Sequence, residues 1–145
     1  MRANAFALAT CLVPCLLLPG RLGASDLEVK LIAHPTRAAR LTEREVRAIY
    51  LRQKLFWDDG SPIVPINLEA GSAAREAFSQ KLFGQDSRRL ATYWNRRYFE
   101  AGEFPPATLA SEEAVMRYVA VNENAIGYVL LEDVTGNVAI VLVLP

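Results

Sequence analysis

Histidine and cysteine are scarce in this sequence, and their scarcity excludes several kinds of site. His34 is the single histidine, and the two cysteines, Cys11 and Cys15, both lie in an apolar N-terminal stretch. A Ser-His-Asp triad, a Cys-His pair and a multi-histidine metal site therefore lack the residues that they need. The glycines form neither a P-loop nor a dinucleotide fingerprint, and calcium-loop spacing is missing. We expect no catalytic residues, no cofactor and no metal, and a protein that is not an enzyme.

The first 24 residues follow the order of a secretory signal peptide. A basic residue, Arg2, precedes an apolar run over Ala5–Leu18, and a small-residue stretch reaches Ala24. That order predicts cleavage near Ala24. The apolar run is too short for a stable membrane anchor, which takes roughly 20 residues. The sequence therefore predicts a signal peptide over 1–24, a single domain over 25–145 and a periplasmic location.

The charge of the chain is balanced. It carries 16 basic and 16 acidic residues, and loss of Arg2 and Arg21 with the signal peptide leaves 14 against 16, a net charge of −2. Proteins that bind nucleic acid or anionic membranes in general carry a clear basic excess. We therefore expect no nucleic-acid partner. Leu90, Trp94 and Tyr98 recur at core spacing, so we interpret the aromatic residues near them as packing residues.

Strand-like and helix-like stretches alternate along the rest of the chain. Strands are predicted over 27–34, 63–68, 125–131 and 138–144, with an extended segment over 104–111. Helices are predicted to begin at Thr42, where Glu45 completes a capping box, and at Ser72, Asp86 and Ser111. This alternation predicts an α/β fold: one layered domain with a mixed, mostly parallel sheet of about four or five strands and helices on both faces. The last two strands are expected to form a hairpin.

The helix that begins at Ser72 places an arginine where a capping box has Glu or Gln. Arg75 there faces the positive end of the helix dipole, which costs about 0.3–1 kcal/mol at an exposed site. A bound anion would offset that cost. The N–H groups of Ala73, Ala74 and Arg75 point out of the helix start, and a guanidinium can hold an oxyanion with two hydrogen bonds. This stretch is our first candidate for a binding site.

A simpler interpretation needs no ligand. Ser72 then only caps the helix, and Arg75 is a solvated residue paired with Glu69 or Glu76. Helix caps are far commoner than ligand sites, so the residues by themselves favour this alternative.

A second loop follows another predicted strand end. It contains His34, Thr36, Arg37 and Arg40. Ligands of α/β proteins bind at the carboxyl ends of strands, so we expect these residues to line the same sheet edge as Ser72 and to form a secondary part of the site. A lone histidine beside a strand end is more often a structural hydrogen-bonding residue.

Three segments share a pattern with a known protein family. They are LTEREVRAIYLRQKLFWDDGSPIVPINLEAGSAAREAF, ASEEAVMRYV and NENAIGYV. Together they resemble the phosphate-type substrate-binding proteins of ABC transporters, most closely the short, single-lobe relatives of that family. The resemblance covers about Leu27 to Val129. It implies one lobe of a type II periplasmic binding protein, with phosphate or another oxyanion as the ligand and a transporter or sensor protein of the envelope as the partner.

The candidate grip departs from the family pattern. Full-length members hold phosphate between two lobes with a Gly-Ser-Gly-Thr segment and an upstream arginine. Here Ala73 and Ala74 replace the last two residues of that segment, and Leu68 replaces the arginine. The resemblance implies as ligand-binding residues Gly71, Ser72, Ala73, Ala74 and Arg75. The alternative is a non-enzymatic interaction or sensory accessory protein of the envelope that keeps the fold without a ligand.

Overall fold

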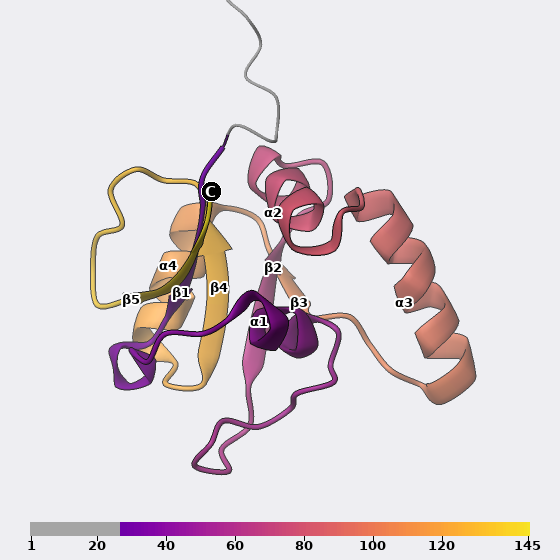
Figure 1. The fold of residues 1–145 in the computed structure, drawn as a ribbon, viewed down its shortest axis with the longest axis horizontal. Helices are drawn as coiled ribbons and strands as arrows, with labels where there is room; N and C mark the ends of the chain where they lie inside the picture. Colours follow the sequence, from indigo (N-terminus) through magenta and orange to yellow (C-terminus); the bar gives the residue numbers. More distant parts are fainter. Residues whose placement is uncertain (1–26) are drawn as a thin grey trace, which may run out of the picture.

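The centre of the fold is a five-stranded sheet with the order β3-β2-β4-β1-β5 (Figure 1). The computed structural model describes residues 27–145, so the predicted signal peptide lies outside the described residues. The strands are β1 (Val29–Ala33), β2 (Val64–Leu68), β3 (Ala107–Leu109), β4 (Ala125–Val129) and β5 (Ala139–Leu144). The helices are the 3₁₀ turn η2 (Pro35–Arg37), α1 (Glu43–Tyr50), α2 (Ala73–Phe83), α3 (Ser87–Ala101) and α4 (Glu112–Val121).

The sheet is mixed, as predicted, but its pairings divide evenly between the two directions. β2 pairs in parallel with β3 and β4, whereas β1 pairs antiparallel with β4 and β5. The predicted hairpin of the last two strands is therefore wrong, because β1 lies between them. β1 is buried at four of its five positions, and a strand buried in this way has neighbours on both edges.

Helices cover both faces of the sheet, and two neighbouring residues of β4 show how. The ring of Tyr128 stacks on Phe78 of α2, with centroids 3.9 Å apart, and lies 5.9 Å from the ring of Tyr50 of α1. A Cβ on Gly127 would lie 2.3 Å from Cγ1 of Val115 of α4, so only glycine allows this close approach. Because successive residues of a strand point to opposite faces, α1 and α2 cover one face and α4 covers the other.

The predicted helix starts are confirmed by their hydrogen bonds. Thr42 and Glu45 form both bonds of the capping box. Ser72, Asp86 and Ser111 each accept a hydrogen bond from the backbone N–H three residues later. Short side chains with oxygen acceptors thus fix where α1, α2, α3 and α4 begin.

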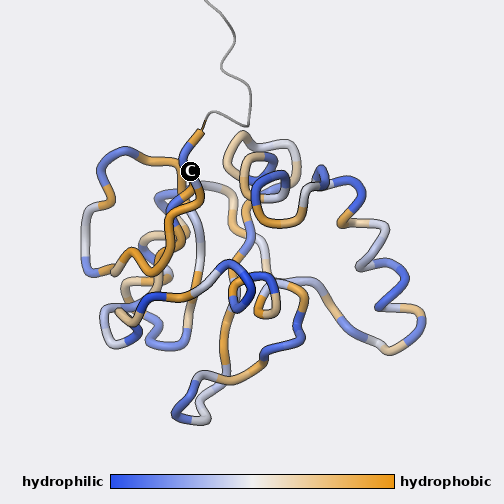
Figure 2. The backbone as a smooth tube through the Cα atoms, in the orientation of Figure 1, coloured by the Kyte–Doolittle hydropathy of each residue, from blue (hydrophilic) through white to orange (hydrophobic). Residues whose placement is uncertain are grey.

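The helix α3 extends away from the sheet beside α2 (Figure 1). Leu90 and Trp94 are buried, but Tyr98 is exposed, so the predicted core stripe ends one turn early. Figure 2 shows the contrast: hydrophobic residues follow β1 and β5, whereas hydrophilic and hydrophobic residues are interspersed along α3. Within residues 27–145, no helix is both long enough and apolar enough to cross a membrane.

Candidate functional site

The strands β2 and β4 separate towards their carboxyl ends. Their register covers two residues of each strand, after which two tyrosine hydroxyls occupy the gap. The Tyr50 hydroxyl donates to the carbonyl oxygen of Ile66 at 3.0 Å, and the Tyr128 hydroxyl accepts from the N–H of Leu68 at 3.1 Å. After β2 the chain runs through α2 and α3 to β3, which lies on one side of β2. It then returns through α4, on the other face of the sheet, to β4 on the opposite side of β2. The gap between β2 and β4 is therefore a topological switch point. Ligands of α/β proteins bind at the carboxyl ends of strands at such points.

The residue that caps α2 uses its hydroxyl within the chain. Ser72 Oγ accepts from the N–H of Arg75 at 3.2 Å and donates to the carbonyl oxygen of Glu69 at 2.9 Å. The N–H groups of Ala73 and Ala74, at the first two helical positions, have no acceptor within the helix. Of the predicted grip, the N–H groups of Ala73 and Ala74 are open, whereas the N–H of Arg75 and the serine hydroxyl are occupied by each other.

Two helix starts share one hollow at this end of the sheet. This α2–α4 hollow, of about 240 Å³, is lined by Ser72, Ala73 and Ala74 of α2 and by Ser111, Glu112 and Glu113 of α4. Both helix dipoles direct their positive ends there, which favours an anion. The negative charges of Glu112 and Glu113 in the same hollow disfavour an anion. Glu112 accepts hydrogen bonds from backbone N–H groups just after β4, at 2.5 and 3.1 Å, while the pKa of Glu113 is lowered mainly by hydrogen bonding to its own backbone.

The side chain of Arg75 lies on the other side of the β2 end. With Asn67 and Trp94 it lines a second depression of about 190 Å³, which we call the Arg75 pocket. Its Nε is buried without a hydrogen-bond partner. Within residues 27–145 no carboxylate forms an ion pair with Arg75. Arg75 is therefore a half-buried cation without an anion, and the solvated ion pair with Glu69 or Glu76 is not formed.

Glu76, the expected partner of Arg75, contacts the start of α3 instead. Its carboxylate accepts hydrogen bonds from the N–H of Ser87 at 3.2 Å, from the hydroxyl of the same serine, and from the N–H of Gly71 at 3.4 Å. Burial raises the pKa of Glu76, but these hydrogen bonds outweigh burial and keep that pKa below its usual value. The carboxylate closest in sequence to Arg75 is thus committed to another helix.

A polar floor lies beneath the Arg75 pocket. Asn67 is only 4% exposed, and its Oδ1 accepts from the Tyr128 hydroxyl at 3.3 Å. Burial raises the pKa of both Tyr50 and Tyr128, while the positive charge of Arg75 acts in the opposite direction on each. Asn67 and Tyr128 are not among the site residues that the sequence predicts. The available signal was a polar residue inside the buried strand segment PINL.

The secondary residues lie at the opposite end of the sheet, so the expectation of one shared edge is wrong. Because β1 is antiparallel to β4, its carboxyl end meets the amino ends of β4 and β2. His34 Nδ1 accepts from the N–H of Thr36 at 3.3 Å and lies 2.8 Å from its hydroxyl oxygen. These contacts cap the short helix η2, which is a structural role.

Arg37, in that same loop, is fully engaged with the protein. Its side chain donates to the carbonyl oxygen of Glu123 (3.1 Å), a carboxylate oxygen of Asp59 (2.6 Å), the hydroxyl of Ser61 (2.6 Å) and the amide oxygen of Asn124 (3.0 Å). Its guanidinium also lies 5.4 Å from the ring centroid of Trp57. Arg37 therefore joins η2 to the turn before β2 and to the start of β4. Within residues 27–145, no group of three or more potential ligand side chains could hold a metal ion.

No protein-family model and no curated protein matches the sequence, but solved structures match the fold. The ABC-type phosphate transport receptor from Vibrio cholerae matches 79% of this chain with a TM-score of 0.62 and 16% identity. A putative phosphate ABC transporter substrate-binding protein with bound phosphate, from Clostridium perfringens, matches 79% with a TM-score of 0.61 and 25% identity. PstS from Borrelia burgdorferi matches 71% with a TM-score of 0.52 and 17% identity.

The chain spans less than half the length of these proteins: 46%, 45% and 41% in the same order. The match is therefore partial and corresponds to a single lobe. The resemblance that the sequence indicated is confirmed at the level of the fold. The described residues have the α/β fold of one lobe of phosphate ABC transporter substrate-binding proteins.

Proposed function

We propose that this protein is an exported, periplasmic solute-binding module without catalytic activity. It holds phosphate or a similar oxyanion at the carboxyl end of β2, in association with an ABC transporter. The observation that carries this proposal is Arg75, a half-buried cation whose Nε has no partner and which lacks a carboxylate. The matched proteins support the ligand class, because they are phosphate-transport proteins and one contains bound phosphate.

An unpaired buried charge is unfavourable, and this explains why the site needs an anion. Removing a guanidinium from water costs free energy that is recovered only when an opposite charge and hydrogen bonds replace the water. An oxyanion supplies both, since it can accept two parallel hydrogen bonds from one guanidinium. Until it binds, Arg75 lowers the stability of the fold.

The backbone at the start of α2 completes the proposed site. Leu68, at the end of β2, borders both the Arg75 pocket and the α2–α4 hollow. In the proposed site, a ligand held by the guanidinium has to extend past Leu68 to reach the open N–H groups of Ala73 and Ala74. Gly71 makes the turn into the helix with φ of 88°, a conformation that favours glycine. Ser72 supports the ligand indirectly by holding this turn.

The alternative is a non-enzymatic envelope protein that interacts with other proteins, or serves a sensor, without binding a ligand. Two observations favour it. The hydroxyl of Ser72 is already occupied, and Glu112 and Glu113 place negative charge beside the start of α2. In this alternative Arg75 is a remnant with no present ligand.

The melting temperature in different anions separates the two functions. We expect phosphate, compared with sulfate and chloride at the same ionic strength, to stabilise the protein, by about 2.7 kcal/mol at 100 times its dissociation constant. Arg75→Leu should abolish the phosphate-specific shift, whereas Arg89→Leu, which removes an exposed arginine of α3, should leave it intact. No anion-specific shift, or a shift that Arg75→Leu leaves unchanged, would favour the ligand-free alternative.

A further inference from the structure

The far end of α3 presents an exposed aromatic cluster, Tyr98, Phe99 and Phe104, which we call the α3-end cluster. These side chains are 48%, 84% and 67% exposed. The ring of Tyr98 contacts both of the others, with centroid distances of 5.6 Å to Phe99 and 5.1 Å to Phe104. Leu90 and Trp94 are buried, but the last two turns of α3 extend beyond the sheet (Figure 1). Contiguous exposed aromatic residues of this kind mark interaction surfaces.

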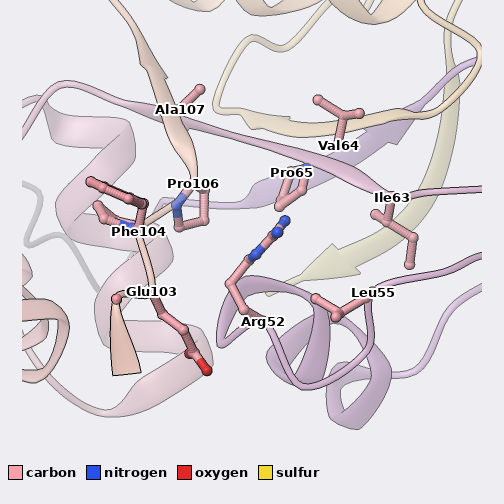
Figure 3. Close-up of a pocket in the computed structure, with 11 residues that line it drawn as sticks. Arg52, Leu55, Ile63, Val64, Pro65, Glu103, Phe104, Pro106 and Ala107 are labelled. Atoms are coloured by element: carbon pink, nitrogen blue, oxygen red, sulfur yellow. The ribbon is translucent and has the colours of Figure 1, made fainter. Parts of the chain in front are cut away.

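A groove lies directly beside the α3-end cluster, and Phe104 belongs to both. The groove has a volume of about 610 Å³ and separates the start of β2 from the segment before β3 (Figure 3). Its walls are mostly apolar and include Leu55, Ile63, Pro65, Phe104 and Pro106. One surface of the molecule therefore offers both a protruding ring, Phe99, and a hollow lined by apolar side chains.

The groove also contains a positive charge that this chain does not neutralise. Arg52 has φ of 59°, and no other non-glycine residue in 27–145 has a positive φ. Side chains rarely adopt this conformation because it brings Cβ close to the backbone. Figure 3 shows its guanidinium directed into the groove towards Pro65. Glu103, the carboxylate in the wall, instead forms an ion pair with Arg97 at 2.5 Å.

The protruding ring has a negative charge beside it. Glu100 follows Phe99 at the end of α3 and is exposed. Within residues 27–145 neither Glu100 nor Arg52 forms an ion pair. The protruding part of the surface is thus aromatic and carries Glu100, with the exposed Arg96 one turn before it, while the hollow part has apolar walls and carries Arg52 and Glu103. The pairs that match in character are Phe99 with the apolar walls and Glu100 with Arg52.

We propose that this surface joins two copies of the chain in a symmetric dimer. Phe99 of each copy enters the groove of the other, and Glu100 pairs with the partner's Arg52. A two-fold interface needs such self-complementarity, because every contact between a residue of one copy and a residue of the other occurs twice. A different partner, such as an acidic peptide, would fill the groove and leave Phe99 and Glu100 without a role. The surface therefore fits a second copy best.

Sedimentation velocity over a range of protein concentrations tests this dimer. The purified protein should show a concentration-dependent equilibrium between monomer and dimer. Phe99→Ser should weaken the dimer at least about tenfold, as expected for an aromatic residue at the centre of an interface. Val121→Ser, which removes an equally exposed apolar side chain on α4, should change nothing. Circular dichroism establishes that each variant is folded.

A charge exchange makes the test specific to the pairing. Arg52→Glu and Glu100→Arg should each weaken the dimer, because each places two like charges opposite one another. Both changes in one chain should restore it towards the original affinity. A protein that is monomeric at every concentration would overturn the proposal and leave the surface to a different protein. A dimer that Phe99→Ser leaves intact, or an exchange that restores nothing, would also overturn it.

Discussion

Arg37 and Arg75 lie at opposite ends of the same sheet, and they differ in what surrounds them. Arg37 reaches four acceptors at hydrogen-bond distance, including the carboxylate of Asp59. Arg75 is also partly buried, but its Nε has no partner and no carboxylate pairs with it within residues 27–145. The comparison separates two uses of one residue type. Arginine with its acceptors in place holds loops together, whereas Arg75 has the Tyr128 hydroxyl as a hydrogen-bond partner but no carboxylate, and we propose that an anion from outside fills that place.

The largest expected effect follows from replacing Arg37, the arginine whose acceptors lie within the protein. Arg37→Met leaves the acceptors at η2, the turn before β2 and the start of β4 without their common donor. We expect the free energy of unfolding, measured by urea denaturation, to fall by about 2–3 kcal/mol. Arg40→Met, an exposed arginine of the same loop, should change it by less than about 0.5 kcal/mol. Equal effects at the two positions would show that the contacts of Arg37 contribute little.

The next effect concerns the floor of the Arg75 pocket. Tyr128→Phe removes the hydroxyl that accepts from the N–H of Leu68 and donates to Asn67. The two buried groups lose a partner, which should cost about 1–2 kcal/mol of stability. Tyr93→Phe removes a hydroxyl for which no hydrogen bond is found, and it serves as the control. If both variants unfold at the same urea concentration, the gap between β2 and β4 is not closed by these hydroxyls.

The third effect has the opposite sign and a smaller size. Arg75→Leu replaces an unpaired, half-buried charge by an apolar side chain, so the anion-free protein should gain about 1 kcal/mol. In saturating phosphate the difference should shrink or reverse, because only the original protein gains from the ligand. Paired urea denaturations with and without phosphate measure both values. A loss of stability in both buffers would mean that Arg75 has a structural role like that of Arg37.

The smallest effect is a change in the titration of Asp59. The hydroxyl of Ser61, then the N–H of Ser61 and then Arg37 hold the pKa of this carboxyl far below its usual value. A lowered pKa means that ionised Asp59 stabilises the fold above the unfolded pKa of about 3.9, and that this contribution is lost as pH falls through the folded pKa. NMR titration should show a larger rise of this pKa in Ser61→Ala than in Arg37→Met. The reverse order would make the ion pair the dominant contact.

Local patterns predicted the helices because their causes are local. A capping residue and the N–H three residues later lie within one turn, so Thr42, Ser72, Asp86 and Ser111 could be identified directly. The fold class followed from the alternation of elements and from the family resemblance. The position of the candidate site after β2 could also be predicted, since it depends on the end of one strand and the start of the next helix.

Strand direction could not be predicted in this way. Nothing in the β1 segment indicates that it runs antiparallel to β4, and that direction places His34 and Arg37 at the opposite sheet end from Ser72. Tyr98 has core spacing with Trp94, but the end of α3 extends beyond the residues that bury Trp94, so Tyr98 is exposed. The surroundings of Arg75 depend on Asn67 and Tyr128, which meet across 61 positions of sequence. Contacts of that kind arise from the tertiary structure alone.

A titration with inorganic phosphate, followed by NMR, tests most directly whether Arg75 is an anion-binding residue. The Nε–H resonance of Arg75 and the amide resonances of Ala73 and Ala74 should shift together and saturate with one dissociation constant. The Nε–H resonance of Arg37 should stay in place, since its acceptors lie within the protein. An unchanged Arg75 resonance, or equal and non-saturating shifts of both arginines, would contradict the account.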